Sequence, residues 1–172
     1  MGLELTLLSN THLLERAAVK NVLECNYVSQ SYGLALTEQQ ALELTQTVAA
    51  ALTESGRVQL GAGITDKLIA VFCQSSYLTP QNYAQSLYEL TRIFYEFKNE
   101  FPSDVSDNEL LSMMYDAFEK YSGGSVDYLA EDLLTRMARN MRAGLPADYI
   151  ERDTLDEDEL YELQSREQRD DL

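Results

Sequence analysis

Residues 83–101 read YAQSLYELTRIFYEFKNEF, and this stretch decides the fold class. Its bulky apolar residues recur at alternating spacings of four and three, which places them on one face of an α-helix. Pro102 directly after the stretch ends the pattern, and Thr79-Pro80 before it is a typical helix start. A helix from about residue 80 to residue 101 is therefore predicted, with this inner face: Tyr83, Leu87, Leu90, Phe94, Phe97 and Phe101.

Helix start and stop signals recur along the rest of the chain. Thr37 with Gln40, and Ser106 with Glu109, have the spacing of capping boxes, in which each side chain bonds the backbone amide of the other. Ser125 is a third candidate cap. These signals and the apolar periodicity predict further helices at about 11–27, 37–55, 106–121 and 125–142, the first with Leu14, Ala18, Val22 and Cys25 on its inner stripe and the last with Leu129, Leu133, Met137 and Met141.

The run at residues 68–73 is apolar on every side, so its periodicity fits either a buried strand or a central helix. We predict a helix, because no second convincing strand exists and a lone strand leaves its backbone groups unpaired. The fold class is then all-α, a compact bundle of about six helices formed by residues 1–147. No internal repeat of solenoid length is apparent in the sequence.

The composition changes near the C-terminus. From Glu151 onward the chain carries ten acidic residues and three arginines in 22 residues. The apolar positions there are few, so we predict that residues 148–172 form an acidic tail that is weakly helical or disordered.

The net charge of -16 excludes several classes of function. A negative surface repels the phosphate backbone, so direct binding of DNA or RNA is not expected. It also repels anionic membranes, and no apolar run approaches the roughly 20 residues of a spanning helix. Cys25 and Cys73 stand singly, without a CxxC pair or a signal peptide, which predicts buried free thiols in a soluble, cytoplasmic protein.

Two glycine-containing stretches resemble known ligand loops but lack the required residues. Gly61-Ala62-Gly63 precedes a helix, yet no third glycine follows and Asp66 adds a negative charge where a phosphate would lie. The turn at Gly124 resembles an EF-hand, but Ala130 stands where calcium needs a glutamate. Plain turns between helices are the preferred interpretation of both.

Other catalytic and metal-binding patterns are equally incomplete. Carboxylate pairs at helical spacing occur, such as Glu96 with Glu100 and Asp127 with Glu131, but the di-metal bundles also need histidines, and His12 is the only one. No nucleophile motif is present. We therefore expect no catalytic residue, no metal and no cofactor, and an enzyme is the less favoured interpretation.

Two features indicate protein interaction. Tyr88 and Tyr95 lie one heptad apart on the flank of the 83–101 face, where tyrosines often border an interface, although a second row of core packing explains them equally well. Arg136, Arg139 and Arg142 form the only basic cluster, and must meet either the acidic tail or an acidic partner.

Several stretches resemble an uncharacterised bacterial family, a domain of unknown function. They are YGLALTEQQA at 32–41, SGRV at 55–58, the block at 61–77 and Asn82-Tyr83-Ala84, and the resemblance spans residues 1 to about 145. The family carries no activity that the resemblance could transfer.

Taken with the residues themselves, the sequence predicts a protein-protein interaction or regulatory module whose partner is another protein. A homo-oligomer is compatible with this interpretation. Two alternatives stay open. One is an enzyme or small-molecule binder with a polar-lined pocket between helices, near 61–66. The other is a nucleic-acid mimic that occupies a DNA-binding protein with its carboxylates.

Overall fold

The computed structural model describes residues 2–58 and 63–149, and within them every regular element is helical. The predicted all-α class is thereby confirmed, and so is the helix at 68–73. No helix in this part of the chain combines the length and apolar character that crossing a bilayer requires. The elements are α1 (Gly2–Glu24), α2 (Asn26–Ser29), the 3-10 turn η1 (Gln30–Tyr32), α3 (Glu38–Glu54), α4 (Thr65–Phe72), α5 (Tyr83–Glu100), α6 (Asp107–Lys120), α7 (Val126–Tyr128), the π-helical turn η2 (Leu129–Leu134) and α8 (Thr135–Arg142).

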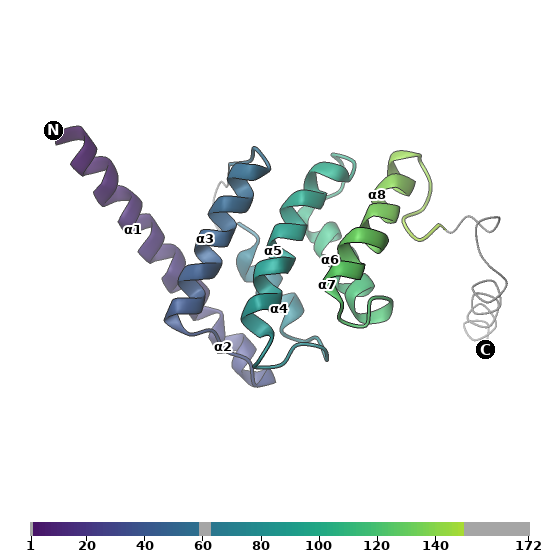
Figure 1. The fold of residues 1–172 in the computed structure, drawn as a ribbon, viewed down its shortest axis with the longest axis horizontal. Helices are drawn as coiled ribbons and strands as arrows, with labels where there is room; N and C mark the ends of the chain where they lie inside the picture. The colour runs from purple at the N-terminus through teal and green to yellow at the C-terminus, as the bar shows by residue number, and fades with distance from the viewer. Residues whose placement is uncertain (1, 59–62, 150–172) are drawn as a thin grey trace.

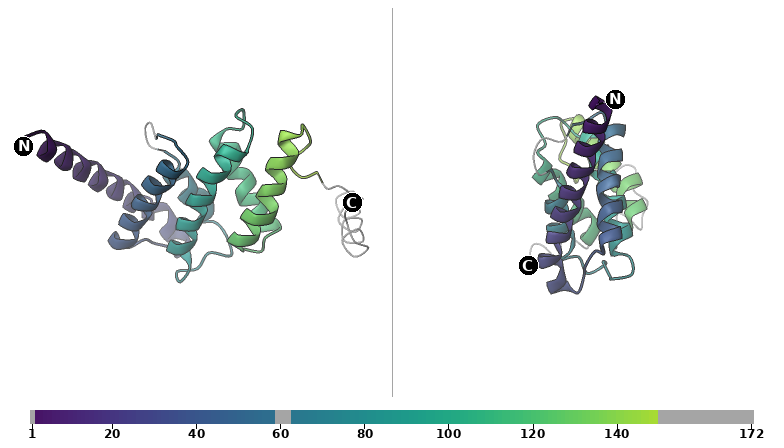
Figure 2. Two further views of the ribbon diagram at one scale, coloured as in Figure 1. Left: turned by 45° about the horizontal axis from the view of Figure 1, so that its top comes forward. Right: turned by 90° about the vertical axis from the view of Figure 1, so that its left-hand side faces the viewer.

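The helices form three antiparallel hairpins stacked along the long axis of the molecule (Figure 1). The first hairpin pairs α1 with α3, the second α4 with α5, and the third α6 with the unbroken segment α7–η2–α8, which α6 contacts at η2. Viewed along the stack, α1, α4 and α6 form one layer and α3, α5 and α8 the other (Figure 2). Helix α3 packs against both α1 and α5, and α5 also packs against α8, so α5 is the central element.

The apolar face of α5 lies at the centre of the core, as predicted. Its six bulky residues, from Tyr83 to Phe101, are each no more than 5% exposed. Phe72 of α4 and Phe118 of α6 meet edge to face behind them, with ring centroids 5.6 Å apart. Burying each such side chain contributes roughly 1.5–3 kcal/mol, which makes this face the main stabilising feature of the fold.

The predicted caps are confirmed. Both capping boxes are complete, with Thr37 accepting from the amide of Gln40 and Ser106 from that of Glu109. Ser125 accepts a hydrogen bond from the amide of Tyr128. These local signals fix where α3, α6 and α7 begin.

Two predicted helices have wrong boundaries. The helix placed at 11–27 begins at Gly2 and ends at Glu24, where a turn at Cys25 separates it from α2. The helix predicted to start at Pro80 begins at Tyr83. A turn precedes it, in which Asn82 Oδ1 accepts from the amide of Thr79 at 2.8 Å and Asn82 Nδ2 donates to the carbonyl of Tyr77 at 3.0 Å.

The last predicted inner stripe is shifted by the π-helical turn. Leu129 and Leu133 are buried as expected, but Met137 and Met141 are only half-buried. A π turn holds one residue more than an α turn, so the residues after it change phase. Leu134 and Ala138 take the buried positions instead.

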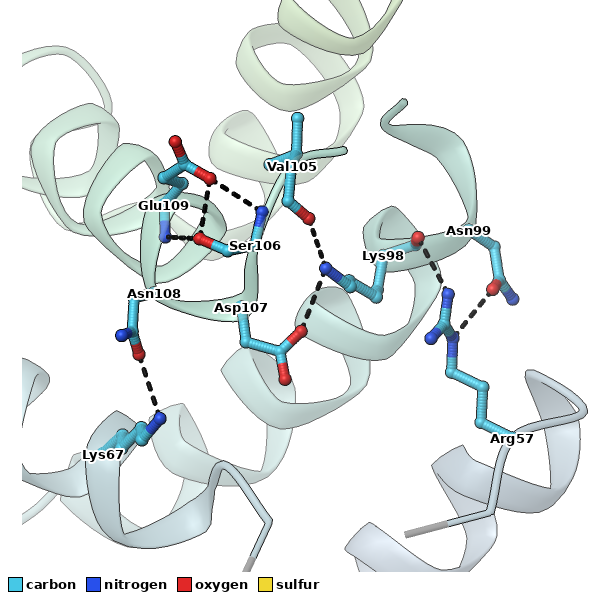
Figure 3. A network of polar contacts seen from close by, with 9 residues as sticks. All are labelled: Arg57, Lys67, Lys98, Asn99, Val105, Ser106, Asp107, Asn108 and Glu109. Atoms are coloured by element: carbon cyan, nitrogen blue, oxygen red, sulfur yellow. Dashed lines mark hydrogen bonds and ion pairs between the residues drawn. The ribbon is translucent and has the colours of Figure 1, made fainter. Parts of the chain in front are cut away.

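Polar side chains join the hairpins where α3, α5 and α6 meet (Figure 3). Arg57 donates to Asn99 Oδ1 at 2.9 Å and to the carbonyl of Lys98 at 3.0 Å. Lys98, which is mostly buried, pairs with Asp107 at 2.9 Å and also donates to the carbonyl of Val105. These contacts link the first hairpin to the second and the second to the third.

Candidate functional site

An open groove of about 1000 Å³ lies between α1, α3 and α4, near the N-terminal end of the stack. It exists because of the shapes of these three helices. Helix α1 leans away from its layer toward its N-terminus (Figure 1). Helix α4 has 8 residues where α3 has 17, so it covers only part of α3. In the described part of the chain, the surface of α3 between α1 and α4 is consequently left partly uncovered.

The α1 wall of the groove is the stripe that the sequence predicts to be core. Leu14, Ala18, Val22 and Cys25 all line it. Their burial increases along the helix: Leu14 is 72% exposed, Ala18 is half-buried and Val22 is 5% exposed. The predicted burial of this stripe is thus correct only at its C-terminal end, since toward the N-terminus α1 diverges from α4.

Helices α3 and α4 supply the floor and the opposite wall. Val48, Ala49 and Leu52 come from α3, and Ile69 and Ala70 from α4. Val48 and Ile69 are buried, Leu52 and Ala70 are half-buried, and Ala49 is exposed. The surface is therefore apolar, and it is continuous with the hydrophobic core.

The charged side chains that line the groove are acidic. They are Glu15 and Glu24 on α1 and Asp66 on α4, and no lysine or arginine is among the described lining residues. His12 lies 3.8 Å from Glu15, and Gln46 donates to Glu15 at 3.4 Å. Glu24 is also 3.7 Å from Lys20, in a pair whose members are both well exposed.

Cys25 lines the inner end of the groove as a protonated thiol. It donates to the carbonyl of Asn21 at 3.4 Å. Burial raises the pKa of the Cys25 thiol, and the carboxylates of Asp66 and Glu24 raise it further. A thiol held in this state is a weak nucleophile at neutral pH. The described residues also contain no cluster of three or more side chains suited to a metal ion.

The structure places the two predicted interface tyrosines inside the fold. Tyr95 is 5% exposed, with its ring 5.3 Å from that of Phe94 in an edge-to-face contact. Tyr88 is half-buried and joins α5 to α3 by donating to Glu43 Oε2 at 2.9 Å. Burial and the nearby Glu43 carboxylate raise the pKa of Tyr88 to about 12. Tyr95 thus packs in the core and Tyr88 between two helices, and their role in partner binding stays a prediction.

The three predicted arginines lie on α8, which directly follows η2. This helix is at the end of the stack opposite the groove (Figure 1). Arg142 pairs with Glu100 of α5 at 2.9 Å, both side chains being about half exposed. Arg136 is half-buried and Arg139 exposed, and among the described residues neither forms an ion pair. Their role in partner binding stays a prediction.

Most of the predicted acidic tail, residues 150–172, lies outside the described residues, but its first residues are placed. Asn140, which is buried, donates to the carbonyl of Ala147 at 3.2 Å and to that of Tyr149 at 2.8 Å. The segment after α8 is thereby folded back against that helix.

The sequence of this chain matches the pattern of DUF6323, a family of unknown function, over residues 21–147. The chain belongs to this family. The match covers α3 to α8 and only the last residues of α1, so the floor of the groove lies within the DUF6323 region and Leu14 and Ala18 lie before it. No curated protein and no solved structure matches the chain. Membership in DUF6323 confirms the resemblance and adds no activity.

Sequence reasoning missed the apolar groove on α1 and α3, and the pocket it considered, near 61–66, was expected to be polar. The only signal available was the contrast between the long apolar pattern of α3 and the short one of α4. That contrast becomes informative only when it is known which helices pair. It then shows which helix is incompletely covered.

Proposed function

We propose that this protein is an interaction module that binds a helical segment of another protein in the groove between α1, α3 and α4. The observation that carries the proposal is the exposed apolar wall of α1, above all Leu14, facing an apolar floor on α3. Amphipathic helices bind in grooves of this kind through apolar side chains spaced one turn apart. The proposed place of action is the cytoplasm, which the two free cysteines support.

The groove favours this function over the enzyme alternative. That alternative predicts a polar pocket with convergent acids or tyrosines. The groove does contain Asp66, as the alternative requires of a site near 61–66, and two further acids, Glu15 and Glu24. Its lining is nevertheless mainly apolar and includes no tyrosine among the described residues. Mimicry of nucleic acid stays open as a prediction.

A matched pair of substitutions tests the groove. Leu14 lines it, whereas the adjacent Leu13 is 62% exposed and does not. A displayed library of helical peptides is selected against the full chain, and the selected peptides are then titrated against Leu14→Glu and Leu13→Glu. We expect Leu14→Glu to weaken binding about thirtyfold, or about 2 kcal/mol, because it places a charge in an apolar contact.

The control variant, Leu13→Glu, carries the same charge on the same helix and should bind the selected peptides as tightly as the parent chain does. Both leucines are mainly exposed, so neither substitution should alter the free energy of unfolding by more than about 0.5 kcal/mol. Selected peptides that bind Leu14→Glu as well as the parent chain, or a library that yields no binder, would exclude the groove as the docking site.

A further inference from the structure

The proposed function leaves the chemistry of the partner open, and the groove itself restricts it. Resting on that function, we infer that the occupant is a basic amphipathic helix of another protein. The apolar face of this partner helix lies on α3 and on the stripe of α1. Its lysines or arginines lie at the acidic rim of the groove, which consists of Glu15, Glu24 and Asp66.

The dimensions of the groove fit a helix of about three turns. The distance along α1 from Leu14 to Cys25 is about 16 Å at the rise of an α-helix. Small side chains on all three helices, including Ala18, Ala49 and Ala70, line the space. They permit the axial separation of about 8–10 Å at which helices pack. A helix bound here would lie between α1 and α4 and complete their layer.

The rim selects the sign of the partner's charge. Glu15, Glu24 and Asp66 come from two helices and surround the apolar surface on which the partner would rest. The nearby cations of α1, Arg16 and Lys20, line a second groove on the side of α1 toward Glu38, which Glu15 also lines. Lys20 lies 3.7 Å from Glu24, in an exposed pair that a basic partner would have to replace. Complementary charge raises association rates and excludes partners of the same sign. The net charge of the groove lining is negative, so a basic flank is attracted to it and an acidic flank is repelled.

The same charges disfavour the other occupants of an apolar groove. A second copy of this chain also carries a net charge of -16, so the two molecules repel each other. An anionic amphiphile would bring its head group to the acidic rim and be repelled there as well.

Two designed peptides of about 18 residues provide the test. They share one leucine face at helical spacing, and their flanks carry lysines in one peptide and glutamates in the other. Binding to the full chain is followed by fluorescence anisotropy. We expect the lysine peptide to bind at least about tenfold more tightly at about 50 mM salt, and the difference to shrink at about 300 mM. We also expect it to slow the alkylation of Cys25, which lines the groove.

A charge-reversal variant separates the rim from the overall charge. Glu15→Lys, Glu24→Lys and Asp66→Lys together should reverse the preference toward the glutamate peptide. The matched control is Asp104→Lys with Glu131→Lys and Asp148→Lys, three exposed acids outside the groove. It changes the net charge equally and should retain the preference for lysine.

Each other outcome overturns a specific claim. Equal binding of both peptides, weakened alike by Leu14→Glu, keeps the docking function and overturns the basic partner. A preference that both triple variants lose equally shows that net charge alone acts, and overturns the role of the rim. No binding of either peptide overturns both claims. Reversible self-association that Leu14→Glu abolishes assigns the groove to a second copy, and overturns the basic partner.

Discussion

Among the glycines compared in the described residues, Gly124 is the one whose surroundings leave no room for a side chain. It lies in the turn between α6 and α7 with a φ of 83°, a left-handed conformation that side chains disfavour. A Cβ atom built on it would come 2.6 Å from both Cβ and Cγ of Tyr77. Tyr77 Cβ is fixed to its own backbone, so the contact cannot be relieved by a rotamer change. The resemblance of this turn to a calcium loop therefore has a steric explanation.

Neighbouring Gly123 provides the comparison. Its φ is 59°, and no atom lies within 4 Å of its would-be Cβ. Gly123→Ala should cost about 1 kcal/mol, the strain of the left-handed conformation alone. Gly124→Ala should cost at least about 2 kcal/mol, because the contact with Tyr77 is added to that strain. Urea denaturation measures both, and equal costs would show that the chain at Tyr77 moves away freely.

At the scale of single elements, the two capping boxes differ in one chemical respect. Thr37 is paired with Gln40, which does not titrate, and Ser106 with Glu109, which does. Glu109 accepts from the amide of Ser106 at 2.8 Å and from its hydroxyl at 2.6 Å. These hydrogen bonds lower the pKa of the Glu109 carboxyl. A lowered pKa in the folded state means that the stabilisation is present above the unfolded pKa and is lost as the pH falls through the folded one.

This difference predicts distinct pH dependences for the two caps. Thr37→Ala should cost about 1 kcal/mol of unfolding free energy, equally at pH 7 and below the pKa of Glu109. The cost of Ser106→Ala should be greatest at pH 7 and decrease on acidification, since the bond to the Glu109 carboxylate is then already lost. Denaturant titrations at several pH values give both costs. A Ser106→Ala cost that does not change with pH would contradict the assigned role of Glu109.

The elements also show what sequence reasoning could reach. Caps and the apolar face of α5 depend on residues within a few turns of one another, so their spacing alone predicts them. The burial of Leu14 depends on the angle between α1 and α4, and the burial of Met137 on one π turn. Tyr95 illustrates the same limit, because its flank position fits an interface or the core equally well. These outcomes are decided by contacts between elements, which the sequence of one element does not contain.

At the scale of the whole molecule, the three hairpins form a short stack (Figure 1). Residues that precede equivalent helices stand at Thr37, Asn82 and Ser125, a spacing of roughly 44 residues. The repetition is not apparent in the sequence, because each of these positions uses a different residue and the joining segments differ. Stacked hairpins contact mainly their neighbours, and an end hairpin therefore has the least support.

The net charge of -16 gives a prediction for the whole fold. Repulsion among the carboxylates opposes compaction, and salt screens it. The midpoint of thermal unfolding should therefore rise between about 20 mM and about 500 mM NaCl. The variant with Asp104, Glu131 and Asp148 replaced by lysine is six charges less negative and should show a smaller rise. A midpoint that falls with salt would mean that ion pairs such as Lys98 with Asp107 outweigh the repulsion.

The bonds from Asn140 to the carbonyls of Ala147 and Tyr149 determine how the protein can be attached to a surface or a label. They hold the chain against α8 up to Tyr149, at the opposite end of the stack from α1 (Figure 1). A tether joined at the C-terminal side therefore presents the groove to the solution. One joined before α1 would place its anchor at the groove end of the stack, on the helix that carries Leu14.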